Sequence, residues 1–218
     1  MSYEEWYFMP SGTGKMGANS MANPLRRTSL QPAEILVRES LANSFDERLE
    51  GSTLTFKVKR HKFVGEAKKN LVEKLSLIEL KHKSSLFADS LNWFEKGRQS
   101  LANLTDLEKP FYCLEISDYN ANGLSGRWNR GITSEDRFYN LVLSINSTKK
   151  QSTEGQHSNI GSFGVGKMVF ALCSNLRFMM YYSRFQPSDR TENVSSRFMA
   201  TGFFPEFYDE NEDIQYSG

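Results

Sequence analysis

A helix predicted near residue 32 carries the first residues that could do chemistry. Pro32, favoured in the first turn of a helix, opens an amphipathic segment that we expect to run to about Arg48. Glu39, Asn43 and Asp46 follow at spacings of four and three, so they share one helix face. Asn is mildly unfavourable inside a helix, which indicates a task for this face. On this face, the Glu39 carboxylate and the Asn43 amide could point together into a cavity. The alternative is a polar face that is exposed to solvent.

The opposite face of the same helix is apolar. Val37, Leu41 and Phe45 recur every four residues, a spacing that aligns side chains along one stripe. We expect this stripe to pack on a sheet, which would leave the polar face free to meet a ligand.

A further carboxylate stands at the end of a predicted strand. Residues 111–117 form a largely apolar run, Asp118 follows, and residues 119–124 combine Asn and Gly. Both residue types tolerate the positive φ angles of tight turns. Asp118 therefore occupies the kind of position where ligands bind in α/β sheets, and the alternative is a turn that only ends the strand.

A glycine-rich turn precedes an apolar, helix-like run at residues 168–172. Its glycines let backbone N–H groups approach a ligand, and the N-terminus of the following helix favours an anion. The order G-x-x-G-x-G-K matches neither a Walker loop nor the dinucleotide fingerprint, and an ordinary loop is the alternative. Lys167 and, upstream, Lys149 could reach a phosphate. The turn consists of Gly161, Ser162, Phe163, Gly164, Val165, Gly166 and Lys167.

Other elements must position these groups. Residues 54–59 alternate apolar and polar side chains, as a half-buried strand does. Residues 62–104 have the spacing of one or two surface helices, broken near Ser84. Residues 125–160 form a long polar connection, which is typical of a mobile lid. Two strands, at residues 176–184 and 196–204, are joined as a hairpin.

We expect a single domain at residues 31–218. Residues 1–30 lack periodicity and predict an irregular arm, whose aromatic residues could dock on a neighbour or belong to a partly ordered tail. The acidic stretch at residues 209–213 has no closing element after it, so we expect this chain to be the N-terminal piece of a longer protein.

Composition predicts a soluble cytoplasmic protein. The 218 residues are 39% hydrophobic, which is enough for a core, and the formal charge of +1 gives no global basic field for nucleic acid. No apolar run approaches ~18 residues, so we expect no membrane span. The start is acidic and has no signal-peptide pattern. Cys113 and Cys173 lie in strand-like and helix-like runs and predict buried thiols in a reducing compartment.

Three of these pieces stand in one order, E-x3-N-x2-D on a helix, Asp and a turn after a strand, and the glycine turn before a helix. Together they resemble the GHKL superfamily of gyrase-type topoisomerases, heat-shock chaperone ATPases, histidine kinases and MutL-type ATPases. Residues 38–46 look like the chaperone N-box, and residues 161–166 look like the second glycine box of chaperones and topoisomerases. The resemblance covers roughly residues 31–204.

The resemblance implies an α/β two-layer sandwich, the Bergerat fold, in which helices cover one face of a mixed, mainly antiparallel sheet and ATP lies under a lid. It implies that Glu39 is the general base that activates water. Asn43 would bind Mg²⁺, a hard ion, through its amide oxygen, and Asp118 would accept the adenine amino hydrogen. Further nucleotide contacts are expected at Asn122, Gly123, Gly161, Phe163, Gly164, Val165, Gly166 and, on a late strand, Thr201.

The first glycine box departs from the family pattern D-x-G-x-G, because Asp118 meets no glycine until Gly123. Either one residue is inserted, or Asn120 and Asn122 supply the left-handed conformations that the glycines would adopt.

Glu39 favours hydrolysis over phosphotransfer, since histidine kinases generally lack a Glu at this place. No phospho-acceptor helix precedes residue 31 either. We therefore expect a Mg²⁺-dependent ATPase that acts as an ATP-gated homodimerisation clamp, with DNA or a protein client bound by regions beyond residue 218. The alternatives are a non-hydrolysing nucleotide sensor and a histidine kinase catalytic domain.

Overall fold

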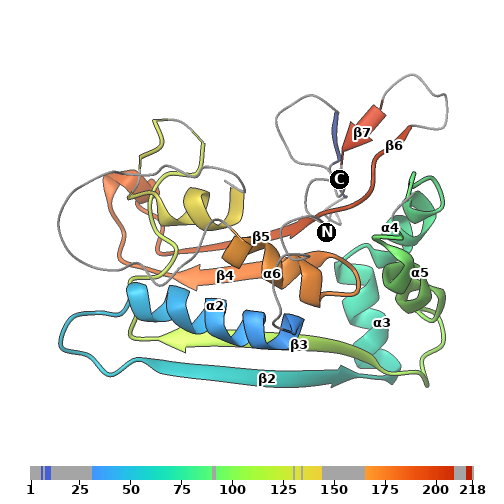
Figure 1. Ribbon diagram of the computed structural model, residues 1–218, viewed down its shortest axis with the longest axis horizontal. Helices are drawn as coiled ribbons and strands as arrows, with labels where there is room; N and C mark the ends of the chain where they lie inside the picture. The colour runs from blue at the N-terminus through green and yellow to red at the C-terminus, as the bar shows by residue number, and fades with distance from the viewer. Residues whose placement is uncertain are drawn as a thin grey trace.

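The chain forms a mixed fold of helices and small antiparallel sheets (Figure 1). The computed structural model describes residues 6, 8–10, 31–89, 92–129, 131–133, 135–143, 165–208 and 215–217. The helices are α2 (Pro32–Asp46), α3 (Gly65–Lys74), α4 (Leu77–Ser84), α5 (Glu95–Ala102) and α6 (Val165–Cys173). The strands are β1 (Met9–Pro10), β2 (Thr55–Phe63), β3 (Phe111–Tyr119), β4 (Phe178–Arg184), β5 (Ser196–Gly202), β6 (Phe207–Tyr208) and β7 (Gln215–Ser217).

Three antiparallel sheets replace the single sheet that we expected. β2 pairs with β3, β4 pairs with β5, and β7 lies between β1 and β6. β3 and β4 run in the same direction (Figure 1). Among the described residues they are not paired with each other, and both border one cavity.

Helix α2 begins and ends within two residues of its predicted bounds. Pro32 stands at its first position, and the Gln31 backbone N–H donates to Glu34 Oε2 at 2.8 Å, one half of a capping box. These local signals explain why the sequence located this helix well.

The predicted orientation of α2 is wrong. Val37, Leu41 and Phe45 are 48%, 41% and 49% exposed, whereas Ile35 and Leu36 are buried against Val169 of α6 and Ile116 of β3. The small buried side chains on this inner face allow α6 to pack closely against α2. They are Ser40, Ala42 and Ser44.

The helices at residues 62–104 do not lie only at the surface, whereas we had predicted one or two surface helices there. The region forms three helices, and Leu77, Leu80, Phe94 and Leu101 are fully buried. These side chains join residues 203–207 in the largest core cluster of the described chain. Because these buried side chains belong to one cluster, the helices are part of the main core.

Lys68 of α3 is a buried basic residue in this region, which we had predicted to form surface helices. Its side chain is 1% exposed, and Nζ donates to the backbone carbonyls of Asn103, Asp106 and Lys109 at 2.6, 2.8 and 2.9 Å. Burial lowers the pKa of Lys68 from its ordinary value. One ammonium group therefore fastens α3 to the loop that leads into β3.

The described part of the N-terminal arm docks on the domain. Trp6 Nε1 donates to the Leu75 carbonyl at 3.0 Å, and its ring lies 5.0 Å from Phe178 and 5.5 Å from Phe204 between centroids. Of the two alternatives for the arm, docking is therefore correct for Trp6 and Phe8, which both pack against the main core.

Three smaller expectations were also tested. The hairpin is confirmed, with Phe178 opposite Gly202 and Arg184 opposite Ser196. The strand predicted at residues 54–59 is confirmed as β2, although Val58 is 52% exposed. Cys173 is exposed, which contradicts the prediction of two buried thiols.

Within the described residues, no helix is long and apolar enough to cross a membrane.

Candidate functional site

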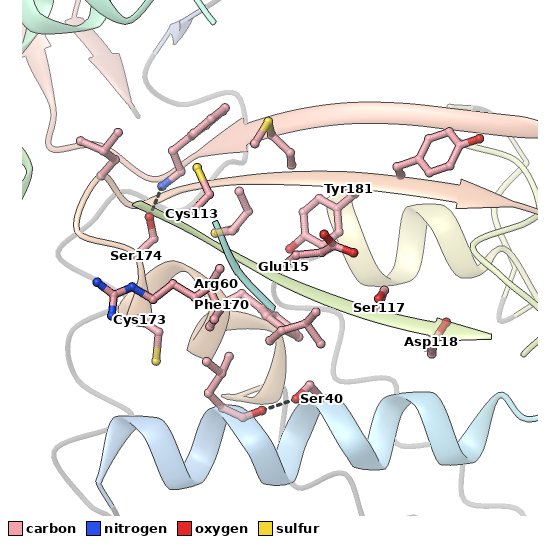
Figure 2. A pocket seen from close by; sticks show the side chains of 18 of the residues that line it. Ser40, Arg60, Cys113, Glu115, Ser117, Asp118, Phe170, Cys173, Ser174 and Tyr181 are labelled. Atoms are coloured by element: carbon pink, nitrogen blue, oxygen red, sulfur yellow. Dashed lines mark hydrogen bonds between the residues drawn. The ribbon is translucent and has the colours of Figure 1, made fainter. Parts of the chain in front are cut away.

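A cavity of ≈ 1630 Å³ lies between α2, β3, β4 and the C-terminal end of α6 (Figure 2). Every residue of β3 and of β4 borders it. Because successive side chains of a strand point to opposite faces, an uninterrupted series can border one cavity only along the edge of the strand. The free edges of β3 and β4 therefore form two of its walls.

One end of this cavity collects several residues that the sequence had singled out. Asn43 and Asp46 of α2 border it together with Asp118 and Gly123. The face of α2 that meets the cavity is thus partly the polar face that we predicted.

Asp118 lies near the end of β3, as predicted, with its side chain on the side of α2 (Figure 2). Ser44 Oγ, from α2, donates to Asp118 Oδ2 at 2.6 Å. This hydrogen bond occupies one carboxylate oxygen and orients the other. Among the described residues, no donor is hydrogen-bonded to Asp118 Oδ1, which is therefore available to a ligand N–H.

Asn43 borders the same end of the cavity. Its Nδ2 atom is buried and has no hydrogen-bond partner among the described residues. Buried polar atoms are normally paired, so an unpaired one calls for an explanation. A rotation of the amide exchanges its oxygen and nitrogen, so this position can offer either atom to a ligand.

Glu39 does not join Asn43 at the cavity, contrary to our prediction. Its side chain is 3% exposed, and Oε1 accepts hydrogen bonds from Arg38 Nη2 at 2.7 Å and Arg38 Nε at 3.1 Å. Glu39 shares the helix side of Ile35 and Ala42, which is buried. The rotation of α2 that buries Ile35 carries Glu39 away from the cavity wall.

The turn after β3 is fastened to the end of α2. Arg137 Nε donates to Glu47 Oε2 at 2.5 Å, and Asn122 Nδ2 donates to the same oxygen at 3.3 Å. The backbone N–H of Asn122 donates to the Glu47 carbonyl at 2.8 Å. Asn122 itself does not border the cavity, whereas Glu47 and Arg137 do. These bonds hold the part of α2 that carries Asn43 beside the turn that follows Asp118.

The departure from the glycine pattern has a structural answer at two positions. Asn120 has φ 65° and Gly123 has φ 72°, so both adopt the left-handed region, but Asn122 does not. A Cβ on Gly123 would lie 2.5 Å from the Arg184 carbonyl oxygen. Gly123 is required by this close approach to β4, and Asn120 adopts a left-handed conformation without a glycine.

The first part of the predicted lid is tied to the hairpin of β4 and β5. Asp136 is fully buried and accepts hydrogen bonds from the N–H groups of Arg127 and Thr133, both at 2.6 Å, and from Arg190 Nη2 at 2.7 Å. Burial alone would raise the pKa of Asp136, but the two backbone N–H groups and Arg190 hold that pKa below its ordinary value. This attachment joins the described residues around Asp136 to the loop between β4 and β5, and the mobility of the predicted lid stays a prediction.

Several predicted site residues are not placed at the cavity. Thr201 pairs with Met179 on the hairpin and does not border the cavity, so the structure does not bring it to Asp118. Residues 165–167 form the first turn of α6, which confirms a helix after the glycine turn, but their side chains lie outside the described structure. Lys149, Gly161, Phe163 and Gly164 also lie outside the described residues.

Sequence reasoning missed four residues at the cavity. Glu47 lies four residues after Asn43, so helical spacing could have indicated it. Ser44 directly follows Asn43, and helical spacing does not place such neighbours on one face. Arg137 carried no signal. Tyr181 of β4 borders the cavity, and burial raises its pKa to about 12, which keeps the phenol protonated as a hydrogen-bond donor.

No protein-family model, curated protein or solved structure matches this chain. Among the described residues, no group of three or more His, Cys, Asp or Glu side chains could hold a metal ion by itself.

Proposed function

We propose that this chain binds ATP with Mg²⁺ in the cavity between α2 and β3, in the manner of a GHKL-type domain with a two-layer Bergerat fold. The observation that carries the proposal is the meeting of Asp118, Ser44 and Asn43 at one end of the cavity, from two elements about 75 residues apart. The three sequence pieces of the resemblance include the first and last of these residues.

The residues present fit the chemistry of a nucleotide. An adenine amino group needs a hydrogen-bond acceptor, and Asp118 Oδ1 offers one while Ser44 holds the other oxygen. The cavity volume of ≈ 1630 Å³ is ample, since ligand pockets are typically about 300–1,000 Å³.

Mg²⁺ would be held by Asn43 and by the phosphates of the nucleotide. Mg²⁺ usually keeps several waters and takes only one or two protein ligands beside substrate phosphates. A single protein oxygen at Asn43 agrees with that habit, because a rotation of the amide, whose Nδ2 atom has no partner among the described residues, turns its oxygen toward such an ion. In a clamp, nucleotide binding would then favour the association of two copies.

Hydrolysis with Glu39 as general base is the less supported part of this proposal. Glu39 is buried, paired with Arg38, and not at the cavity. This placement favours the second candidate function, a nucleotide-sensing module that binds ATP and changes shape without turnover. A histidine kinase domain remains the third alternative.

The experiment that tests the proposal is calorimetric titration of the protein with ATP and ADP. Asp118→Asn should weaken both at least about tenfold, because a hydrogen bond to a charged group contributes ~1.5–3 kcal/mol. Asp189→Asn, an exposed carboxylate on the hairpin loop, is the matched control and should bind normally. Undiminished ADP affinity in folded Asp118→Asn would refute the assignment.

The second measurement separates the ATPase from the sensor. If Glu39 is the base, Glu39→Ala should lose turnover by ~10²–10⁴ and still bind ATP, because general-base catalysis contributes that factor. Turnover at the parental rate would remove Glu39 from catalysis. The parental protein should also be incubated with γ-labelled ATP, because a histidine kinase would retain the label on the protein. If the parental protein binds ATP, shows no turnover and retains no label, the nucleotide-sensing module is the remaining candidate.

A further inference from the structure

The outer face of α2 carries an apolar stripe that the proposed nucleotide site does not use. Val37, Leu41 and Phe45 are each between 41% and 49% exposed, and none of them borders the cavity. Exposure of large apolar side chains to water is unfavourable in free energy. Contiguous exposed apolar patches therefore commonly mark interaction surfaces.

Two opposite charges stand at the ends of this stripe. Glu34 lies one turn before Val37 on an exposed position of α2. At the other end, the Arg48 guanidinium lies 4.0 Å from the centroid of the Phe45 ring. The stripe therefore runs from a carboxylate, across three apolar side chains, to a guanidinium.

This order of side chains is complementary to itself in an antiparallel arrangement. If two such helices cross with their Leu41 residues at a two-fold axis, Val37 of one copy faces Phe45 of the other. Glu34 is seven residues before Leu41 and Arg48 is seven after it, so these opposite charges also meet, twice by symmetry. A parallel arrangement would instead place like charges together.

We propose that the outer face of α2 docks on the same face of a second copy of this chain, antiparallel and centred on Leu41. One helix of 15 residues spans about 22 Å. Its contact area falls below the roughly 1,200 Å² of stable interfaces, so the association is weak and depends on concentration. It requires no nucleotide, although the dimer of the proposed clamp could use the same surface.

The first test is sedimentation equilibrium of the whole chain over a range of concentrations without nucleotide. The parental protein should dimerise at high micromolar concentration. Leu41→Arg should weaken the dimer at least about tenfold, because two buried like charges would meet at the axis. Val194→Arg, at a 42% exposed apolar residue on the hairpin loop, is the matched control and should leave the dimer unchanged. A monomer at all concentrations, or a dimer that survives Leu41→Arg, would overturn the proposal.

The second test examines the antiparallel register. Glu34→Arg and Arg48→Glu should each weaken the dimer by about threefold or more, since each creates two like-charge contacts. The double variant restores opposite charges and should recover the parental dimer. Failure of the double variant to recover, with helix content unchanged by circular dichroism, would overturn the arrangement.

The outcome is separable from that of the proposed function. Leu41 is directed away from the cavity, so Leu41→Arg should bind ATP with parental affinity. Dimerisation through α2 in a protein that fails to bind ATP would refute the nucleotide proposal alone. ATP binding by a strictly monomeric protein would refute the docking surface alone.

Discussion

At the scale of single residues, the orientation of Asp118 depends on the hydroxyl of Ser44. The two side chains come from β3 and α2, and their oxygens are 2.6 Å apart. A carboxylate that already accepts one hydrogen bond is fixed in rotation, so its free oxygen can be aimed at a ligand before the ligand arrives. Ser44 is therefore a positioning residue in the proposed site.

Ser44→Ala should lower ATP affinity by about three- to tenfold, since the bond to Asp118 is worth ~1 kcal/mol. Calorimetry on Ser44→Ala, Asp118→Asn and the double variant would measure the coupling. Because the hydroxyl acts only through Asp118, the double variant should bind no worse than Asp118→Asn. Additive losses would show that Ser44 contacts the nucleotide independently.

At the scale of elements, Asp136 holds the segment after Gly123 against the hairpin. Asp136→Asn should lower the free energy of unfolding by about 2–3 kcal/mol at pH 7, because it weakens a buried charged hydrogen-bond set. Urea unfolding followed by fluorescence measures this loss. Glu135→Gln, an exposed neighbour, should change stability by less than about 0.5 kcal/mol.

The effect of Asp136 should depend on pH. The pKa of Asp136 is lowered in the folded protein, so its stabilisation is fully present above the ordinary carboxyl value of 3.8. It is lost as the pH falls below that value and through the lower folded pKa. The stability difference between the parental protein and Asp136→Asn should therefore be constant from pH 5 to 7 and shrink below about pH 4. A difference that stays constant to pH 2 would contradict the ionised state of Asp136.

The helices α3–α5 offer a matched pair of lysines. Lys68 donates to three backbone carbonyls, whereas its neighbour Lys69 is exposed and makes only a 4.0 Å ion pair with Glu66. Lys68→Met should cost about 2–3 kcal/mol of stability, since it removes the charged hydrogen bonds of a buried ammonium group to three backbone carbonyls. Lys69→Met should cost less than about 0.5 kcal/mol. Equal effects in thermal unfolding would refute the fastening role of Lys68.

At the scale of the whole molecule, ATP should stabilise the fold because the proposed site joins α2 to β3. At an ATP concentration of about 100 times the Kd, binding adds ~2.7 kcal/mol, which corresponds to a rise in Tm of roughly 5–10 °C for a chain of this size. Chelation of Mg²⁺ should reduce the shift, and Asn43→Ala should show the reduced shift with Mg²⁺ present. A full, Mg²⁺-dependent shift in Asn43→Ala would remove Asn43 from the metal site.

The sequence by itself determined the features that depend only on residues close together along the chain, namely the position of α2, the strands and the turn after Asp118. Pro32 and the Gln31–Glu34 capping box set the start of α2, alternation located β2, and an apolar run located β3. The two strands of the hairpin were also predicted from the sequence. The turn chemistry after Asp118 was also readable, since Asn120 and Gly123 do adopt positive φ angles. These features are local because backbone sterics and hydrogen bonds within a few residues decide them.

Only the tertiary structure decided which face of each element is buried. α2 has two apolar sides, and the sequence could not choose between Val37–Leu41–Phe45 and Ile35–Leu36. In the folded protein, the buried side of α2 is the one whose small residues allow α6 to approach. This orientation places Glu39 away from the cavity and places Ser44 within hydrogen-bond distance of Asp118. Such pairings join residues far apart along the chain, so no local pattern encodes them. They follow from close packing of the whole core, which admits few arrangements of its elements.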